Sequence, residues 1–278
     1  MSPPLSAQRT ARRGAGRPPA SWREPSHRRK DSHDGAEDRP GHRRRARTGP
    51  GHGPAPDARG RLGAGHLPHQ RLRGRSGHHP RLRFRRLDVT RPDTFPEFVT
   101  TVRAALREHF GAESFDYLVN NAGIGTFAPY ETTAPEQFDE LVRINLKAPY
   151  FLTQALLPLI NEGGRVLNVS TALTRGVVPG MSAYAATKGA VEVLTRYQAV
   201  ELAGRSIRVN TLMGGAVATD FGRGTMNSPE VRELAAETIT QGRIATVDDI
   251  TAAVPAVLSD AFQWATGALI DVSGGQSI

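Results

Sequence analysis

The chain has 278 residues, enough for one large domain or two small ones, and a formal net charge of +9. It contains no cysteine, which excludes a disulfide-stapled fold and a cysteine-ligated metal site, and no apolar run reaches the ~18–20 residues of a membrane span. The positive charge is confined to one part of the chain. Residues 1–85 hold 21 of the 36 Lys and Arg residues and 6 of the 27 Asp and Glu residues, whereas residues 86–278 have a net charge of −6.

Residues 1–85 do not resemble a folded domain. They contain no Val, Ile or Tyr but 11 Pro and 12 Gly, so they cannot bury enough apolar surface to offset the entropy lost on ordering. No apolar segment follows Arg12-Arg13, which argues against a twin-arginine export signal. We therefore expect a disordered segment on a cytoplasmic protein, with no membrane and no nucleic acid as partner. A basic nucleic-acid arm at Arg43-Arg44-Arg45 is the lesser alternative.

Beyond this segment, strands and helices alternate. Strands are predicted over residues 83–89, 115–119, 164–170, 206–212 and 268–272, and helices over residues 93–110, 135–159, 182–202, 229–240 and 247–258. This alternation predicts an α/β fold with a parallel sheet covered on both faces. Ligands bind at the carboxyl ends of such strands, so the loops after Val119, Ser170 and Leu212 are the candidate site loops.

One pair of residues suggests proton-transfer chemistry. Tyr184 and Lys188 are four residues apart and share a helix face. A tyrosine ordinarily ionises near pH 10, and a neighbouring ammonium is expected to lower its pKa toward neutrality. With three lysines and five tyrosines in the chain, such a spacing is expected by chance only ~0.05 times. The alternative is a surface tyrosine beside a solvated lysine.

Several further motifs occur in a matching order: Asp88 in Leu-Asp-Val, Asn120-Asn121-Ala122-Gly123, Asn145 in Ile-Asn-Leu-Lys, the segment from Val209 to Asp220, and Asp271-Val-Ser-Gly-Gly. Together with Tyr184 and Lys188 they resemble the short-chain dehydrogenase/reductase family, over about residues 86–278. The likeness extends to 3-oxoacyl-acyl-carrier-protein reductases and other carbonyl reductases. It implies a Rossmann-type doubly wound parallel sheet and an NAD- or NADP-dependent oxidoreductase acting on a small carbonyl or alcohol substrate, with no metal.

The resemblance also implies roles for single residues. Tyr184 would be the catalytic acid/base, Lys188 would hold the nicotinamide ribose and lower the pKa of Tyr184, and Asn145 would hold a proton-relay water. The remaining cofactor contacts would come from Asp88, Asn121, Ala122, Gly123, Gly215, Val217 and Thr219. In the family the two long helices, about residues 135–160 and 182–203, form a subunit interface, so a homodimer or homotetramer is expected.

Two positions depart from the family pattern. The substrate-orienting serine is expected about 13 residues before the tyrosine, where this chain has Thr171. Its hydroxyl can still polarise a carbonyl, and Ser170 is the fallback. The second departure is Gly214, where the family usually has proline. It loses rigidity beside the cofactor and is expected to weaken binding modestly.

The largest departure is the absence of the family's first strand and its Thr-Gly-x-x-x-Gly-x-Gly turn, which approaches the pyrophosphate. A shifted reading frame would explain this. Written in GC-rich codons, residues 40–49 shifted by one base can read Leu-Val-Thr-Gly-Gly-Ala-Arg-Gly-Leu-Gly. We hypothesise a frame error from about codon 33 to codons 80–86, with residues 1–32 as upstream translation. We expect the chain as written to be inactive and a corrected chain to be a dehydrogenase. The alternative is a catalytically dead relic that acts as an assembly partner.

Overall fold

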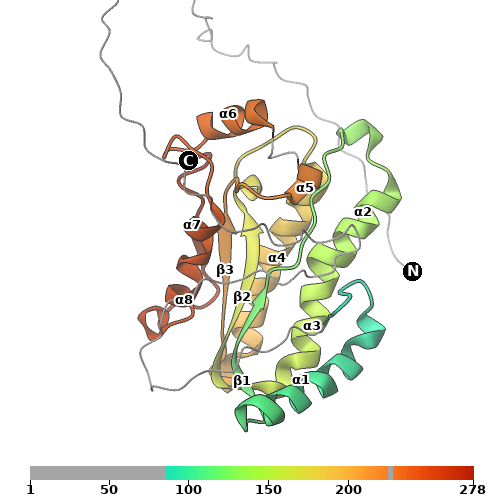
Figure 1. The fold of residues 1–278 in the computed structure, drawn as a ribbon, viewed down its shortest axis with the longest axis vertical. Coiled ribbons are helices and arrows are strands. Elements are labelled where there is room, and N and C mark those ends of the chain that lie inside the picture. The colour runs from blue at the N-terminus through green and yellow to red at the C-terminus, as the bar shows by residue number, and fades with distance from the viewer. Residues whose placement is uncertain (1–85, 225–227) are drawn as a thin grey trace, which may run out of the picture. The chain divides into compact units, whose positions relative to one another are not determined.

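The computed structural model describes residues 86–224 and 228–278, drawn as the coloured ribbon of Figure 1. Everything predicted for residues 1–85 lies outside these described residues: the lack of a fold, the missing phosphate-binding turn, the basic arm and the shifted reading frame.

The described part is built on a parallel sheet, as the alternation of strands and helices predicts. Its strands, in spatial order, are β1 (Phe115–Asn120), β2 (Ile160–Thr171), β3 (Arg208–Gly214) and β4 (Leu269–Val272). All three neighbouring pairs run parallel, with Val119 opposite Leu167 and Leu212 opposite Ile270. The carboxyl ends of β1, β2 and β3 therefore meet at one edge, where the candidate loops begin.

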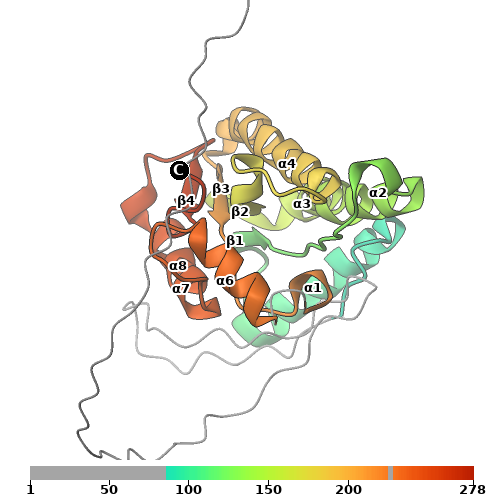
Figure 2. The same cartoon turned by 90° about the horizontal axis from the view of Figure 1, so that it is seen from above.

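Helices connect these strands. They are α1 (Phe95–Phe110), α2 (Pro135–Val142), α3 (Ala148–Leu156), α4 (Ser182–Glu201), α5 (Phe221–Gly224), α6 (Pro229–Glu237), α7 (Val247–Thr251) and α8 (Ala253–Val257). Figure 2 shows α3 and α4 on one side of the strands and α7 and α8 on the other. The Rossmann-type arrangement expected from the motifs is thus present in the described residues.

The two layers of the core follow from the alternation of side chains along β2. Val166 packs with Val209 and with Ala199 of α4, whereas its neighbour Leu167 packs on the opposite face with Val257 of α8. Near-continuous burial of β2 and β3 is what a parallel sheet covered on both faces requires.

The long helix predicted over residues 135–159 is interrupted. A π-helical segment, Arg143–Lys147, separates α2 from α3. Pro149 has no backbone N–H to donate to the carbonyl of Asn145, so a regular helix cannot run through this point. Pro255 divides the predicted helix 247–258 into α7 and α8 by the same mechanism, because it cannot donate to the carbonyl of Thr251.

Other boundaries also differ from the prediction. The strand predicted over residues 83–89 is wrong for its described part, where Asp88 alone makes a bridge and Val89 begins a turn. β2 begins four residues before the predicted start, and α6 ends at Glu237 rather than at residue 240.

Among the described residues, β1 is the outermost strand, since only β2 pairs with it. Two of its apolar side chains, Tyr117 and Val119, are 44% and 38% exposed on the face opposite α3. A strand inside a doubly wound sheet would bury both, so the described residues leave this strand less covered than its neighbours.

A buried polar network joins the sheet to the helices on one face. Asn168 of β2 is fully buried; its Oδ1 accepts from Asn120 Nδ2 (2.8 Å), and its Nδ2 donates to Thr195 Oγ1 (2.9 Å) and Gln198 Oε1 (3.0 Å). Thr211 Oγ1 also donates to Thr195 Oγ1, at 2.7 Å. Because every hydrogen-bonding group of the Asn168 amide has a partner, the network fixes β1, β2 and α4 in one arrangement.

We expect Asn168→Ala to lower the free energy of unfolding by about 2–4 kcal/mol, because it leaves several buried polar groups without partners. The matched control is Asn161→Ala, in the same strand. Asn161 is only partly buried, and its side chain is hydrogen-bonded to Ser114 and Asp116 near the surface. The control should cost no more than about 1 kcal/mol in urea denaturation. Equal losses for the two variants would contradict the role given to the network.

Candidate active site

The structure brings together the side chains that the motifs single out at the carboxyl edge of the sheet. Thr171 ends β2, Tyr184 and Lys188 lie in the first two turns of α4, and Asn145 lies in the π-helical segment. All four side chains are buried. They approach one another from three separate segments of the chain.

Tyr184 forms the centre of this group. Burial raises the pKa of Tyr184 to about 12, and the nearby Thr171 side chain opposes that rise. The expectation that Lys188 lowers the pKa of this phenol is therefore wrong for the described site. Loss of water around the phenolate is the largest cause of the shift.

Lys188 is equally buried. Its Nζ donates to the carbonyl oxygen of Val169 at 2.9 Å, and burial lowers the pKa of the ammonium to about 8. A Cβ at Gly123 would come within 3.2 Å of both Lys188 Nζ and Asn145 Oδ1. Glycine at this position lets another group approach the backbone. The Lys188 ammonium beside it has further N–H groups that can donate hydrogen bonds.

Asn145 clamps the loop that follows β1. Its Oδ1 accepts from Ile124 N at 2.9 Å, and its Nδ2 donates to Ile124 O at 3.0 Å and to Thr187 Oγ1 at 3.1 Å. Thr187 Oγ1 in turn donates to the carbonyl oxygen of Tyr184 at 2.7 Å. The asparagine thus ties the loop after β1 to the turn of α4 that carries Tyr184.

The two candidate hydroxyls after β2 have different partners. Ser170 Oγ donates to Glu192 Oε1 at 2.6 Å, on the α4 side of the strand, whereas the Thr171 side chain lies near the Tyr184 phenol. Thr174 Oγ1 also donates to Glu192 Oε1 at 2.8 Å, and this holds the turn after Thr171. Motif matching missed Glu192. Its position four residues after Lys188 on the same helix face was the available signal.

Phe221, the first residue of α5, is a second residue that the motifs missed. Its ring lies 5.3 Å from the Tyr184 ring, centroid to centroid, at 58°. It also packs so closely over Gly125 that a Cβ there would come within 2.4 Å of the ring. Phe221 N donates to Thr219 Oγ1 at 3.3 Å, which links the loop after β3 to the Tyr184 side chain.

The loop after β3 is held from the C-terminal segment. A Cβ at Gly215 would lie 2.7 Å from the carbonyl oxygen of Ser273, and Ala216 N donates to Gln276 Oε1 at 2.8 Å. Val217 forms a parallel bridge with Ala245. Gly214, in contrast, has open space around its Cβ position, so the departure from proline is not forced by packing there.

The remaining predicted cofactor residues lie further along the same edge. Asp88 accepts from Thr90 N at 3.0 Å and from Thr90 Oγ1 at 2.7 Å, an Asx-type turn ahead of α1. Asn121 is exposed, and Ala122 packs against the apolar cluster of Leu87 and Val89. None of these contacts reaches the Tyr184 side chain.

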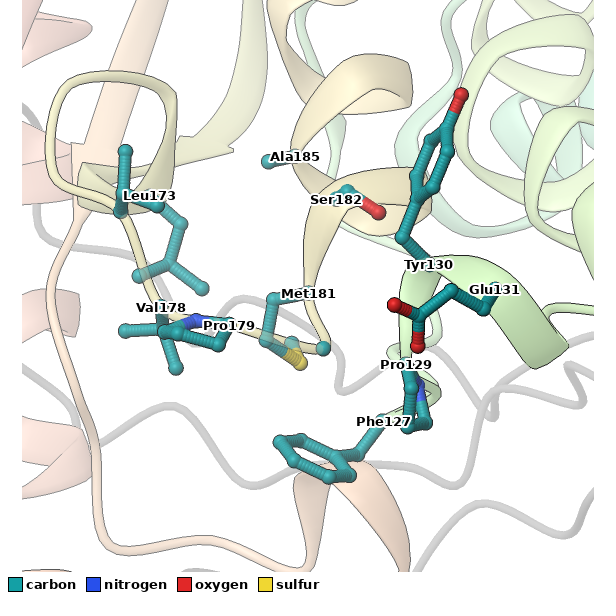
Figure 3. A pocket seen from close by; sticks show the side chains of 12 residues that line it. Phe127, Pro129, Tyr130, Glu131, Leu173, Val178, Pro179, Met181, Ser182 and Ala185 are labelled. Carbon is teal, nitrogen blue, oxygen red and sulfur yellow. The ribbon is translucent and has the colours of Figure 1, made fainter.

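A pocket of about 520 Å³ opens beside α4 (Figure 3). Leu173 and Val178 lie on one side of it and Tyr130 and Glu131 on the other, with Ser182 of α4 between them. It lies next to the candidate catalytic group, since Leu173 N donates to Thr171 Oγ1 at 3.4 Å.

Comparison with known proteins identifies the family. A family model described as enoyl-(acyl carrier protein) reductase matches residues 70–277. The chain belongs to the short-chain dehydrogenase/reductase family. The match begins before residue 86, so the likeness extends further toward the N-terminus than the motifs indicate.

Relatives of this short-chain oxidoreductase include cyclopentanol dehydrogenase of Comamonas testosteroni, 33% identical over 198 residues, which are 70% of this chain and 76% of the relative. Carbonyl reductase (NADPH) 2 of Sus scrofa is 33% identical over 168 residues, 59% of this chain and 69% of the relative. The prediction of an oxidoreductase family is thus confirmed.

Solved structures share the fold. The angucycline C-6 ketoreductase LanV with bound NADP has a TM-score of 0.62 and 37% identity, covering 68% of this chain and 71% of its own. The 3-ketoacyl-(acyl-carrier-protein) reductase from Brucella melitensis complexed with NADH has a TM-score of 0.61 and 34% identity, covering 69% and 77%. In the part of this chain that the structure describes, no helix is long and apolar enough to cross a membrane.

The lowered pKa of Lys188 predicts a pH-dependent stability. Between pH 8 and the usual lysine pKa of 10.5, the unfolded chain binds more protons than the folded one, so stability rises with pH. The free energy of unfolding of the wild type, relative to Lys188→Met, should therefore rise by up to about 3 kcal/mol across this range. Tyr184 is present in both proteins, and its raised pKa changes the free energy of unfolding only above pH 10. A difference that stays flat in urea denaturation from pH 7 to 10.5 would contradict the burial of a charged Lys188.

Proposed function

We propose that the described domain is built to interconvert a carbonyl compound and an alcohol, with Tyr184 as the acid/base. The observation that carries the proposal is the approach of the buried Tyr184 and Thr171 side chains to each other at the carboxyl edge of the sheet, beside an open pocket. NADP or NAD, when bound, supplies the hydride for reduction or accepts it for oxidation.

The raised pKa of Tyr184 suits the reduction direction. A phenol with a pKa of about 12 is fully protonated at neutral pH and can donate its proton to a carbonyl oxygen. We assign to the Thr171 hydroxyl the orientation of the same oxygen. The carbonyl carbon gains the hydride, its oxygen gains the Tyr184 proton to give the alcohol, and Tyr184 regains a proton from water.

The residues around Gly123 fit the nicotinamide side of the cofactor. The buried Lys188 ammonium gives one hydrogen bond to Val169 and has two N–H groups left, which suit ribose hydroxyls. Gly123 leaves the neighbouring backbone approachable. We assign ribose binding to Lys188 and contacts with the nicotinamide to the loop of Gly215, Val217 and Thr219. Asn121, Ala122 and Asp88 are assigned to the remainder of the cofactor.

Asn145 is assigned to positioning and to the relay of protons through water. The first assignment is supported by its clamp on Ile124. Proton relay requires a water on the Lys188 side, where Asn145 Oδ1 and Lys188 Nζ both lie within 3.2 Å of the Cβ position of Gly123.

The alternative is a chain that has the catalytic residues but no catalysis, acting as an assembly partner. It is supported by the outermost position of β1 among the described residues, with Tyr117 and Val119 exposed, and by the absence of the phosphate-binding turn from the sequence. Isothermal titration of the 278-residue chain with NADPH and NADH separates the two. Under the frame-shift hypothesis the affinity is weaker than micromolar for the chain as written and is restored in the frame-corrected chain.

In whichever of these chains reduces ketones, Tyr184→Phe should lower kcat at least about 100-fold, because it removes the proton donor. Thr171→Val should lower kcat about 10–100-fold. Ser170→Ala is the matched control, since that hydroxyl bonds Glu192, and it should retain most of the activity. Steady-state kinetics check all three. A larger loss from Ser170→Ala than from Thr171→Val would move the orienting role to Ser170.

We also propose self-association through α3 and α4. Val193, Tyr197 and Val200 form an exposed apolar stripe on α4, and Tyr197 and Val200 are 65% and 78% exposed. Tyr150 is a further exposed aromatic residue, on α3. An interface formed by this stripe would bury apolar surface that a monomer leaves in water.

Light scattering after size exclusion should give a dimer or tetramer for the wild type, and Tyr197→Glu should shift the mass toward the monomer. Leu234→Glu, at an equally exposed apolar residue of α6, is the control and should leave the mass unchanged. A monomeric wild type at about 50 μM, or identical masses for the two variants, would refute this interface.

A further inference from the structure

The walls of the pocket beside α4 are mainly apolar. Leu173, Val178 and Met181 form one side, and Phe127 and Tyr130 face them from the loop after β1 (Figure 3). Phe127 is fixed there, because its ring packs against Gly180, and Ala128 N donates to the carbonyl oxygen of Gly180 at 2.9 Å. The two loops that make the walls are thus pinned to each other rather than independent.

The pocket lies beside the candidate reacting hydroxyls, although neither Thr171 nor Tyr184 lines it. Leu173 donates its backbone N–H to Thr171 Oγ1 at 3.4 Å, and the Thr171 side chain lies near the Tyr184 phenol. Ala185, the next residue after Tyr184, also lines the pocket. A molecule whose carbonyl oxygen reaches Thr171 and Tyr184 therefore extends its remaining atoms between these walls.

The walls expose apolar side chains to water. Tyr130, Phe127 and Val177 are 85%, 65% and 90% exposed, although they gather around one concave site. Such gathered apolar exposure is typical of a ligand-binding surface, and the volume of about 520 Å³ suits a body of two or three fused rings.

The charge of the pocket is of one sign. Glu131 is the one charged residue among the described residues that line it, and Ser182 is the one hydroxyl besides that of Tyr130. An anionic body would meet a like charge with no lining cation to offset it, whereas a neutral apolar body would not.

We propose that the substrates of this chain are neutral ketones, or the matching secondary alcohols, carried on a broad apolar ring system. Anionic carbonyl compounds such as phosphate-bearing acyl thioesters are disfavoured by Glu131. This inference rests on the proposed function for its carbonyl chemistry, and on the pocket alone for the neutral, apolar body.

Two probes that share an acetylnaphthalene body and differ by one carboxylate group test the preference: 2-acetylnaphthalene and 6-acetyl-2-naphthoate. Their dissociation constants for the full 278-residue chain are measured by isothermal titration without cofactor. The neutral ketone should bind at least about tenfold more tightly than the carboxylate. Glu131→Gln should narrow that gap about threefold or more by improving binding of the carboxylate, with little change for the neutral ketone.

Wall variants locate the binding. Phe127→Ser and Leu173→Ser should each weaken binding of 2-acetylnaphthalene at least about fivefold, because they remove apolar contact area. Trp264→Ser is the matched control, since Trp264 is 98% exposed and precedes β4 at the opposite end of the sheet. Each variant is first compared with the wild type by thermal unfolding. If a wall variant fails to fold, Val178→Ser takes its place.

Equal affinities for the two probes, or wall variants that behave as Trp264→Ser does, would overturn the inference. Because binding is measured without cofactor, its outcome is independent of turnover. If the neutral probe binds preferentially but the frame-corrected chain reduces no ketone, the proposed function fails while the pocket assignment stands. If ketones are reduced but the carboxylate is preferred, the pocket assignment alone fails.

Discussion

The architecture depends on one buried face of α4. Tyr184, Lys188, Thr195 and Ala199 recur on this face at helical spacing, and all are buried against β2 and β3. The same face therefore provides apolar packing at one end, the polar network with Asn168 in the middle, and the candidate catalytic pair at the other end. A rotation of the helix would disturb all three at once, so the position of Tyr184 is as firmly set as the core itself.

Burial on this face also determines the chemistry. Removing water raises the pKa of Tyr184 and lowers that of Lys188, since both shifts favour the uncharged form. At neutral pH Tyr184 is therefore protonated and uncharged, whereas Lys188 is still mostly an ammonium, held by its hydrogen bond to Val169. The acid/base behaviour of Tyr184 and Lys188 therefore depends on the polar surroundings that a bound ligand or water supplies.

The wall of the site comes from a break in a helix. Pro149 prevents a regular turn at Asn145, and the resulting π-helical segment directs the asparagine side chain toward the loop after β1. That loop then carries Gly123 to the lysine, Gly125 to Phe221 and Phe127 to the pocket. Catalytic group and pocket are therefore positioned by one connected set of contacts, with β1 as its support. The exposed Tyr117 and Val119 show that this support is itself incompletely covered within the described residues.

The sequence by itself determined the alternation of strands and helices, the parallel sheet, the family and the group of Thr171, Tyr184, Lys188 and Asn145. These follow from periodicity and from spacing within one segment, which local chemistry controls. Tertiary structure alone decided the partners of Ser170 and Thr171, the direction of the Tyr184 pKa shift and the contact of Phe221 with Tyr184. Each depends on burial or on residues distant in sequence. Pro149 was visible in the sequence, but its effect on Asn145 became meaningful only once the loop after β1 was seen to lie against it.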